Sequence, residues 1–348
     1  MRNIGQATLA PHEACNVVFG ANASGKTSLL EAIHILGLAR SFRTPHIKQV
    51  IARGEDSLTV FGRRRRRDGS ELGLGIERGR QETRIRVGGA NVDRAAELAR
   101  WLPVQVITPE SHEILEQGPK FRRQFLDWGV FHVEHGFIEA WRSYYRALRQ
   151  RNAALRQGGT EEAIRLWDET LAANATALTQ ARRTYLERLR PWLADYVGRL
   201  LGLEVRFDLH AGWARDLSYG QALAAALGSD REAGFTRQGP HRADLSIRAE
   251  GVSVQQSLSR GQQKLLVAAM RLAQVRLLGE AQGERCVLLV DDLPAELDRE
   301  RRTRLMGLLS EAEAQVFVTS TERDLLDLSP WASCKLFHVE HGTIAEVV

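Results

Sequence analysis

The 348-residue sequence contains few cysteines, few lysines and no long apolar run. Its three cysteines, Cys15, Cys286 and Cys334, lie far apart, and no C-x-x-C or Cys/His cluster accompanies them. This argues against a disulfide framework or a zinc site, and we expect a reducing, cytoplasmic compartment with Cys286 buried in an apolar strand. No stretch approaches the roughly 18 apolar residues of a membrane-spanning helix. The first residues lack the basic and apolar regions of a signal peptide.

Nearly all basic residues are arginines. Lysine and arginine together number 48 against 43 acidic residues, and only five are lysines, so the net charge is +5. This excess favours an anionic partner such as nucleic acid, although a GC-rich genome would produce the same arginine bias. The length and the 43% of hydrophobic residues allow one or two domains with a large core.

The segment GANASGKT at 20–27 matches the phosphate-binding P-loop pattern G-x-x-x-x-G-K-[ST]. An apolar run before it predicts a strand, and apolar residues at helical spacing after it predict a helix. Glycines permit backbone conformations in which amide groups line a phosphate, and the helix N-terminus adds a favourable dipole. We expect Lys26 to contact the β- and γ-phosphates of ATP and Thr27 to bind Mg²⁺. The predicted nucleotide-binding residues are Gly20, Ala21, Asn22, Ala23, Ser24, Gly25, Lys26 and Thr27.

A second motif, VLLVDD at 287–292, is an apolar strand that ends in two carboxylates. Taken alone, this motif also fits a buried strand followed by an acidic turn with no catalytic role. In a chain with a P-loop it predicts a Walker B motif, in which Asp291 holds Mg²⁺ and Asp292 orients or activates the attacking water. We therefore expect Lys26, Asp291 and Asp292 to be the catalytic residues, and Thr27 and Asp291 to be the metal-binding residues.

A third motif, LSRGQ at 258–262, is similar to the L-S-G-G-Q signature of ABC ATPases, with arginine in place of the first glycine. A serine hydroxyl, a glycine amide and a helix N-terminus together predict a second phosphate clamp, which in ABC ATPases acts on ATP held by the other subunit. An ordinary serine cap at the start of a helix is the alternative. The predicted clamp residues are Ser259, Arg260, Gly261 and Gln262.

The rest of the chain alternates between strand and helix patterns. Period-two alternation from about 57 to 92 predicts antiparallel hairpins. Helical spacing from about 119 to 202 predicts a helical hairpin, with Pro191 ending or kinking its second helix. Beyond residue 262, helices alternate with apolar strands, as in a parallel sheet.

These patterns predict an α/β fold: a two-lobed ABC-ATPase head with a P-loop NTPase sheet, antiparallel hairpins and a mainly helical second lobe. Lobe I carries the two Walker motifs and lobe II carries the signature. The expected boundaries assign 1–108 and 282–348 to lobe I, and 109–281 to lobe II.

Motif spacing and five longer segments resemble the RecF family. Lys26 and Asp291 lie 265 residues apart, with the signature just before the second motif. Such an insertion is typical of the SMC and RecF group, whereas ABC transporter subunits place these motifs much closer. The resembling segments are GANASGKTSLLEAIHILGLARSFRT (20–44), VITPESHEILEQGPKFRRQFLDWGVFH (106–132), QGPHRADL (238–245), SRGQQKLL (259–266) and VDDLPAELD (290–298).

The resemblance implies an ATP-dependent DNA-binding protein of recombinational repair, replication restart and the SOS response to DNA damage. It implies action at single-strand gaps and junctions, and help with RecA loading. The implied cofactors are ATP and Mg²⁺, and the implied partners are single- and double-stranded DNA, RecO, RecR and a second copy of the chain in an ATP-dependent homodimer, with no membrane. The implied activity is a weak, DNA-stimulated ATPase that gates dimerisation. By position, Asp298 would be the D-loop residue at the dimer interface.

The sequence also departs from the related families. RecF proteins normally begin with another strand before a Phe-Arg-Asn segment, whereas this chain starts at Met1-Arg2-Asn3, so we expect one strand of lobe I to be missing. ABC transporters carry glutamate at the Asp292 position, and a histidine after the strand that here ends in Thr319-Ser320-Thr321. The shorter carboxylate and the missing histidine both imply slow turnover.

Three alternative assignments remain open. An SMC-like chromosome ATPase head would normally carry long heptad repeats, which are lacking here. A transporter ATPase subunit would bind a membrane partner rather than DNA. A DNA-binding scaffold would bind ATP without hydrolysing it.

The DNA-contacting residues are also open. Arg63–Arg67 is either a basic patch or a solvated hairpin tip, and on a strand its side chains would alternate between faces. Arg142, Arg146 and Arg149 share a predicted helix face that would neutralise phosphates, although long surface helices commonly carry arginine. The hexapeptide FHVEHG occurs at 131–136 and again at 337–342, and we interpret this as coincidence rather than as a repeat.

Overall fold

The computed structural model describes residues 1–66, 68–292 and 297–347, which form two compact units. Unit 1 comprises Met1–Ser111 and the chain from Lys264 onward, and unit 2 comprises His112–Gln263. The second boundary therefore lies inside helix α10 (Arg260–Gln282), well before residue 281. The physical reason is packing within unit 1, where the α10 residue Arg271 donates a hydrogen bond to the side chain of Gln105 over 2.8 Å.

Unit 1 is built on a six-stranded sheet with the order β13-β12-β1-β11-β10-β6. All neighbouring strands are parallel except β12 and β13, which form an antiparallel hairpin at the edge. Parallel sheets are covered on both faces, which explains why the VLLV strand is buried along its whole length. The strands are β1 (Cys15–Phe19), β6 (Val104–Ile107), β10 (Val287–Val290), β11 (Gln315–Ser320), β12 (Cys334–Glu340) and β13 (Thr343–Val347).

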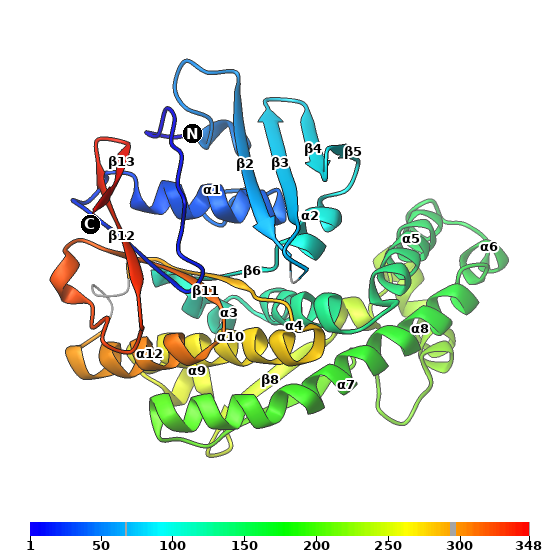
Figure 1. Cartoon of the computed structure of the whole chain (residues 1–348). Helices are drawn as coiled ribbons and strands as arrows, with labels where there is room; N and C mark the ends of the chain where they lie inside the picture. Colours follow the sequence, from blue (N-terminus) through cyan, green and yellow to red (C-terminus); the bar gives the residue numbers. More distant parts are fainter. Residues whose placement is uncertain (67, 293–296, 348) are drawn as a thin grey trace. The chain divides into compact units, whose positions relative to one another are not determined.

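Helix α1 (Lys26–Leu38) lies between this sheet and a second, antiparallel sheet (Figure 1). On one side of α1, Leu30 packs with Leu289 of the six-stranded sheet. On the other side, Ile35 packs with Leu74 of the antiparallel sheet, which has the strand order β2-β3-β4-β5 and matches the predicted hairpins. The remaining elements of unit 1 are β2 (Ser57–Arg65), β3 (Glu71–Gly79), β4 (Thr83–Val87), β5 (Ala90–Val92), α2 (Ala95–Trp101), α12 (Arg299–Glu311), and the 3₁₀ helices η1 (Ile47–Gln49) and η4 (Arg323–Leu325).

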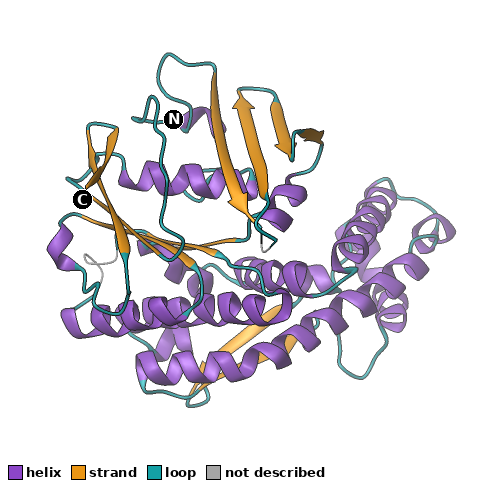
Figure 2. Ribbon diagram, viewed as in Figure 1, coloured by secondary structure: helices purple, strands orange, loops and turns teal. Residues whose placement is uncertain are grey.

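Unit 2 is mainly helical, with one three-stranded antiparallel sheet (Figure 2). Its longest helix, α7, runs from Asp168 to Leu201 with Pro191 inside it, so of the two predicted alternatives, an end or a kink at Pro191, the end is wrong. The tertiary contacts of α7 with neighbouring helices outweigh the loss of one backbone hydrogen bond at the proline. The other elements are α3 (Glu113–Glu116), α4 (Pro119–Val133), α5 (Phe137–Arg156), α6 (Glu161–Arg165), α8 (Tyr219–Ala233), α9 (Val254–Ser257), β7 (Val205–His210), β8 (Asp244–Ala249), β9 (Val252–Ser253), η2 (Pro109–His112, across the boundary) and η3 (Pro240–Arg242).

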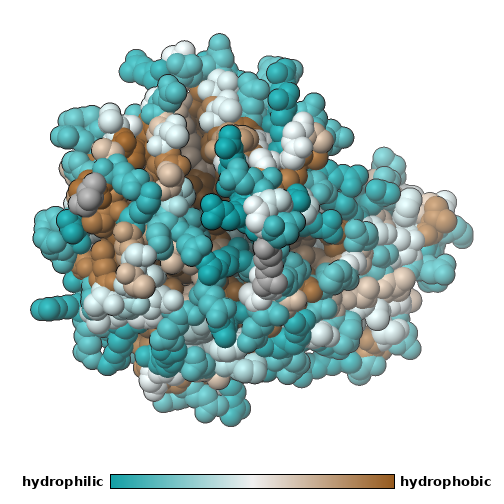
Figure 3. Space-filling model, viewed as in Figure 1, coloured by the Kyte–Doolittle hydropathy of each residue, from teal (hydrophilic) through white to brown (hydrophobic). Residues whose placement is uncertain are grey.

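The face of the chain drawn in Figure 3 is predominantly polar. Hydrophilic side chains cover most of the face shown in Figure 3, and hydrophobic ones form small, separate areas. Among the helices that the structure describes, none is both long enough and apolar enough to span a bilayer.

Candidate functional site

The P-loop joins β1 to α1 and contains three residues with positive φ. Gly20, Ala23 and Gly25 have φ values of 150°, 62° and 128°. A Cβ atom on Gly20 would also lie 2.2 Å from the carbonyl oxygen of Val339 in β12. Glycine at position 20 is therefore required by both its backbone conformation and the close approach of β12, and turns of this kind form anion-binding concavities of backbone amides.

The residues before β1, 1–14, form an N-terminal arm that is hydrogen-bonded to the P-loop. The side-chain amide of Asn3 donates hydrogen bonds to the carbonyl oxygens of Ala23 and Ser24, over 3.1 and 2.9 Å. The backbone N–H of Gly342, in the β12–β13 turn, donates a further bond to Ser24 over 2.9 Å. Sequence patterns did not identify Asn3 or Gly342, because neither is close to the motif along the chain.

Lys26 is buried at the start of α1, with 6% of its surface exposed. Its ammonium group donates hydrogen bonds to the carbonyl oxygens of Gly20 (2.7 Å) and Ala21 (3.0 Å), so the side chain folds back over the loop. Burial lowers the pKa of Lys26, and the nearby carboxylates of Asp292 and Asp291 partly offset this effect. The structure thus brings the predicted lysine and both predicted carboxylates into one electrostatic environment.

Asp291 lies at the C-terminal end of β10 and contacts two hydroxyl groups. Its Oδ1 atom accepts hydrogen bonds from Thr27 (3.1 Å) and from Thr319 at the end of β11 (2.8 Å). Burial raises the pKa of the Asp291 carboxyl group, whereas the two hydrogen bonds lower it. The two predicted metal-binding residues are therefore in direct contact, and Thr319 is a functional candidate that the sequence patterns did not reveal.

Asp292 has an unusual backbone conformation. Its φ is 50°, in the left-handed region that is strained for residues other than glycine. The backbone N–H of Asp292 donates to Thr319 Oγ1 over 2.7 Å. A single threonine side chain therefore contacts both carboxylate residues, Asp291 and Asp292, which we call the acidic pair. The predicted D-loop residue, Asp298, caps α12 by accepting a bond from the N–H of Arg301 over 2.9 Å. The segment 293–296 between them lies outside the described residues.

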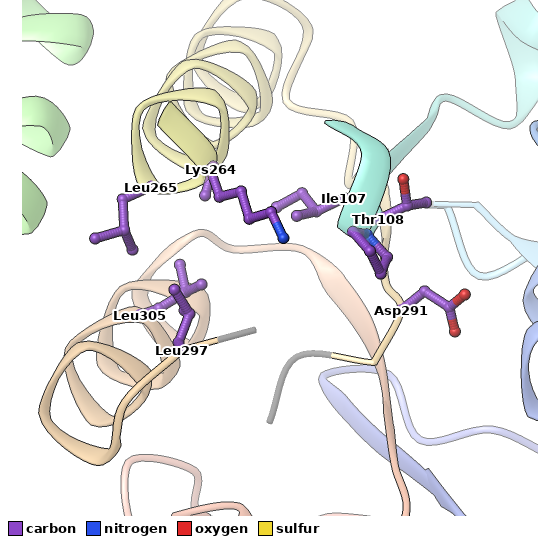
Figure 4. Close-up of a pocket in the computed structure, with 9 residues that line it drawn as sticks. Ile107, Thr108, Lys264, Leu265, Asp291, Leu297 and Leu305 are labelled. Carbon is purple, nitrogen blue, oxygen red and sulfur yellow. The ribbon is translucent and has the colours of Figure 1, made fainter. Parts of the chain in front are cut away.

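Unit 1 contains a small pocket beside Asp291. Lys264 and Leu265 of α10, Leu305 of α12 and Thr108 after β6 line it together with Asp291 (Figure 4). The amino group of Lys264 points toward Thr108, whereas the carboxylate of Asp291 points away from Lys264. The reactive end of Asp291 is therefore directed to Thr27 and Thr319 rather than into this pocket.

The predicted signature residues form the N-terminus of α10. Gln262 accepts a hydrogen bond from the N–H of Ser259 (3.0 Å), and Ser259 accepts one from the N–H of Gln262 (3.4 Å). These two reciprocal bonds cap the start of α10, as expected if the motif is an ordinary serine cap. Ser259 and Arg260 are exposed, and Gly261 and Gln262 are half-buried, so the turn faces solvent within unit 2.

The candidate DNA-binding arginines differ in exposure. Arg63 and Arg65 are exposed on β2, whereas Arg64 is directed inward and contacts the carbonyl oxygen of Trp101; Arg67 lies outside the described residues. The expectation that the arginine run alternates between faces is therefore confirmed for its described part. On α5, Arg146 and Arg149 are exposed and Arg142 is half-buried.

The chain matches a protein-family model and known proteins along nearly its whole length. The family model of the RecF/RecN/SMC N-terminal domain matches residues 1–345. The DNA replication and repair protein RecF of Pseudomonas fluorescens is 45% identical over 352 residues, which cover 99% of this chain and 96% of that protein. Its counterpart from Pseudomonas aeruginosa is 44% identical, with 99% and 95% coverage.

Solved structures show the same fold. A structure described as the recombination mediator protein RecF-ATP in the RecFOR pathway is 26% identical with a TM-score of 0.88, covering 100% of this chain and 95% of that one. An Smc head bound to the C-winged helix domain of ScpA is 16% identical with a TM-score of 0.59, covering 99% and 94%, and it shares the fold. By sequence along nearly its whole length, the chain belongs to the RecF family.

Proposed function

We propose that this chain is an ATP-dependent DNA-binding protein of recombinational repair and replication restart. The observation that carries the nucleotide assignment is the convergence of Thr27, Asp291 and Thr319 beside a P-loop. The DNA-directed role is supported by the similar Pseudomonas proteins, which are named for DNA replication and repair, and by the similar structure described as RecF-ATP.

The residues at this site fit Mg²⁺ and ATP. Mg²⁺ at nucleotide sites takes one or two carboxylates, a P-loop hydroxyl and phosphate oxygens, and the contact between Thr27 and Asp291 supplies the first two donor types. The hydroxyl of Ser24 is buried in the P-loop without a hydrogen-bond partner among the described residues, which suits a phosphate oxygen as its acceptor. When bound, the metal ion neutralises charge on the phosphates.

Each residue then has a defined task. Lys26 binds the β- and γ-phosphates once its ammonium leaves the loop carbonyls. Thr319 positions Asp291 through its hydroxyl and Asp292 through a backbone bond. Asp292 orients the attacking water, and its short side chain favours slow turnover.

Hydrolysis is proposed to be coupled to dimerisation. In this scheme Ser259, with Arg260, Gly261 and Gln262 of the same turn, clamps the phosphates of ATP held by a second copy, using a helix N-terminus that faces solvent in unit 2. Asp298 then lies near the interface of the ATP-dependent homodimer. DNA stimulates the weak ATPase, and hydrolysis opens the dimer and releases DNA.

Membership of the RecF family supports a proposal for the cellular role. We propose action at single-strand gaps and their junctions with duplex DNA, together with RecO and RecR, to help RecA load. The net charge of +5 supports a nucleic-acid partner.

The test is the solution mass of the protein with Mg²⁺ and ATP, with and without duplex DNA. We expect wild type to change from monomer to dimer with ATP. Lys26→Met should lose ATP binding, and Ser259→Arg should bind ATP but stay monomeric. Thr176→Arg, which places the same side chain at an exposed position of α7, is the control and should dimerise like wild type.

Two outcomes would contradict parts of this proposal. If wild type binds ATP and stays monomeric with and without DNA, the signature does not act as a clamp between copies. If the dimer forms but no phosphate is released, the protein is an ATP-binding scaffold rather than an ATPase.

A further inference from the structure

Cys15 and Cys334 lie directly opposite each other on neighbouring strands. β1 and β12 pair in parallel with the register Cys15↔Cys334, and both thiols are free. Residues in register on adjacent strands project from the same face of the sheet, and neighbouring strands lie about 4.7–4.9 Å apart. Disulfides join residues whose Cα atoms are roughly 4.4–6.8 Å apart, so the strand spacing is compatible with a bond between these cysteines.

The two thiols differ in their environments. Cys15 is fully buried, whereas Cys334 is partly exposed at the first position of β12. A hydrogen bond between the two thiols lowers the pKa of Cys334, and the same bond together with burial raises the pKa of Cys15. Because Cys334 is the more exposed of the two, it is the thiol that ionises first.

His12 fixes the segments that precede both cysteines. Its Nδ1 atom accepts hydrogen bonds from the backbone N–H groups of Ala14 (3.1 Å) and Cys15 (3.4 Å). Since Nδ1 is the acceptor, the proton is on Nε2, which donates to the hydroxyl of Ser333 over 2.9 Å. One imidazole ring thus links the residue next to Cys334 to the backbone of Cys15, which maintains the register of the pair.

Cys286 provides a contrast within the same unit. It is 1% exposed, its thiol donates to the carbonyl oxygen of Pro103 over 3.4 Å, and burial raises its pKa. A thiol in this environment is protonated and out of reach of solutes. The third cysteine therefore serves as an internal control for the other two.

We propose that Cys15 and Cys334 form a dithiol site that small disulfides, such as oxidised glutathione, convert reversibly to an intramolecular disulfide. The thiolate of Cys334 attacks one sulfur of the reagent, whose S–S bond breaks and releases one glutathione thiolate. Cys15 then attacks the Cys334 sulfur, its proton passes to the leaving glutathione sulfur, and the second glutathione departs as a thiol. Two protein thiols are oxidised and one reagent disulfide is reduced to two thiols.

The disulfide would link the two strands that lead to the P-loop, at the end that is far from the loop. It joins the first residues of β1 and β12, and β12 continues to Val339, whose carbonyl oxygen packs against Gly20. Because the bond lies at the end of the strand pair that is remote from the loop, we expect oxidation to raise the thermal unfolding midpoint and to leave nucleotide affinity within about twofold. This inference stands independently of the proposed function.

The experiment uses the purified 348-residue protein and oxidised glutathione. After exposure of the folded protein, the remaining thiols are alkylated in denaturant, and intact mass and peptides are measured. We expect a loss of two hydrogen atoms, one alkylated cysteine (Cys286), and a linked peptide pair that contains Cys15 and Cys334. Dithiothreitol should restore alkylation of all three cysteines.

Variants separate the two steps of the exchange. Cys15→Ser should stop at a glutathione adduct on Cys334, and Cys334→Ser should remain unmodified under the same exposure. Cys286→Ala should form the same bridge as wild type. The proposal is overturned if folded wild type keeps three alkylatable cysteines, retains a stable adduct on Cys334, or forms a disulfide between two chains; these wild-type results decide the question even if a serine variant fails to fold.

Discussion

The side-chain amide of Asn3 donates a hydrogen bond to the carbonyl oxygen of Ser24 over 2.9 Å, which ties the N-terminal arm to the P-loop. The same amide bonds the carbonyl oxygen of Ala23, and its own oxygen accepts a bond from the hydroxyl of Ser28 over 3.0 Å. Ala23 has a positive φ of 62°, a conformation that costs free energy in a residue other than glycine. We infer that Asn3 helps to keep the loop in this conformation.

Replacing Asn3 should weaken nucleotide binding. Asn3→Ala removes three hydrogen bonds to the loop and helix start, each of which contributes about 0.5–1.5 kcal/mol. We expect the Kd for ATP to rise by about tenfold, since part of the binding energy is then used to order the loop. Isothermal titration with ATP measures this change. Gln6→Ala, which removes an exposed amide from the same arm, is the control; equal affinities for all three proteins would contradict a role for Asn3.

Thr319 should matter for hydrolysis more than for binding. Thr319→Val keeps the shape of the side chain but removes the hydroxyl that contacts Asp291 and the N–H of Asp292. With the acidic pair no longer held in place, we expect steady-state ATP hydrolysis to fall by about 10- to 100-fold, in the range seen when residues that orient metal ligands are changed. The Kd for ATP should change by less than about threefold.

A control for this prediction is Thr343→Val, which makes the same substitution at an exposed strand position in unit 1. Its hydrolysis rate should equal that of wild type. If Thr319→Val hydrolyses ATP at the wild-type rate, the two hydrogen bonds do not contribute to positioning the carboxylates.

The ion pair between Arg182 and Asp127 should contribute strongly to the stability of unit 2. Arg182 is 1% exposed and makes two hydrogen bonds to Asp127, over 2.8 and 2.9 Å, and a third to the carbonyl oxygen of Pro240. Arg182→Met leaves the carboxylate of Asp127 without its partner. We therefore expect the free energy of unfolding to fall by about 3–5 kcal/mol, measured by urea denaturation.

The matched control is the more exposed pair Arg188–Glu134 in the same unit, joined over 3.2 Å. Solvent screens that pair, so Arg188→Met should lower the free energy of unfolding by at most about 1 kcal/mol. Similar losses for the two variants would show that burial does not determine the contribution of these ion pairs.

Protonation of His241 should destabilise the protein in mild acid. Its ring lies between the hydroxyl of Tyr144 (2.7 Å) and the carbonyl oxygen of Thr236 (3.0 Å), and burial lowers its pKa to about 4. The unfolded state has the higher pKa, about 6.5, so stability is fully present above pH 6.5 and is lost as the pH falls toward 4. For this residue alone, the loss in the free energy of unfolding approaches about 2–3 kcal/mol.

The measurement is the free energy of unfolding from pH 7.5 to pH 4.5. His241→Gln should reduce its slope below pH 6.5 by about 1 kcal/mol per pH unit. His46→Gln, which makes the same substitution at an exposed position, is the control. An unchanged slope in His241→Gln would mean that this histidine does not titrate differently in the folded and unfolded states.

Some side-chain partners could not be read from the sequence. Arg64 illustrates this, since period-two alternation predicts that it faces away from Arg63 and Arg65, but not that it contacts Trp101. The two FHVEHG hexapeptides show that a short sequence does not determine its own secondary structure. Residues 131–133 end helix α4, whereas residues 337–340 belong to strand β12, so identical local sequence adopts the structure that its neighbours stabilise.

The sequence alone determined the features that depend on short-range geometry. These are the P-loop between a strand and a helix, the buried VLLV strand with its acidic end, and the antiparallel hairpins, because glycine positions and apolar periodicity act within a few residues. Only the tertiary structure decided which distant residues meet. Asn3 reaches Ser24, Thr319 reaches Asp291, and Cys15 faces Cys334, because strand order and register, which local periodicity does not encode, bring these segments together.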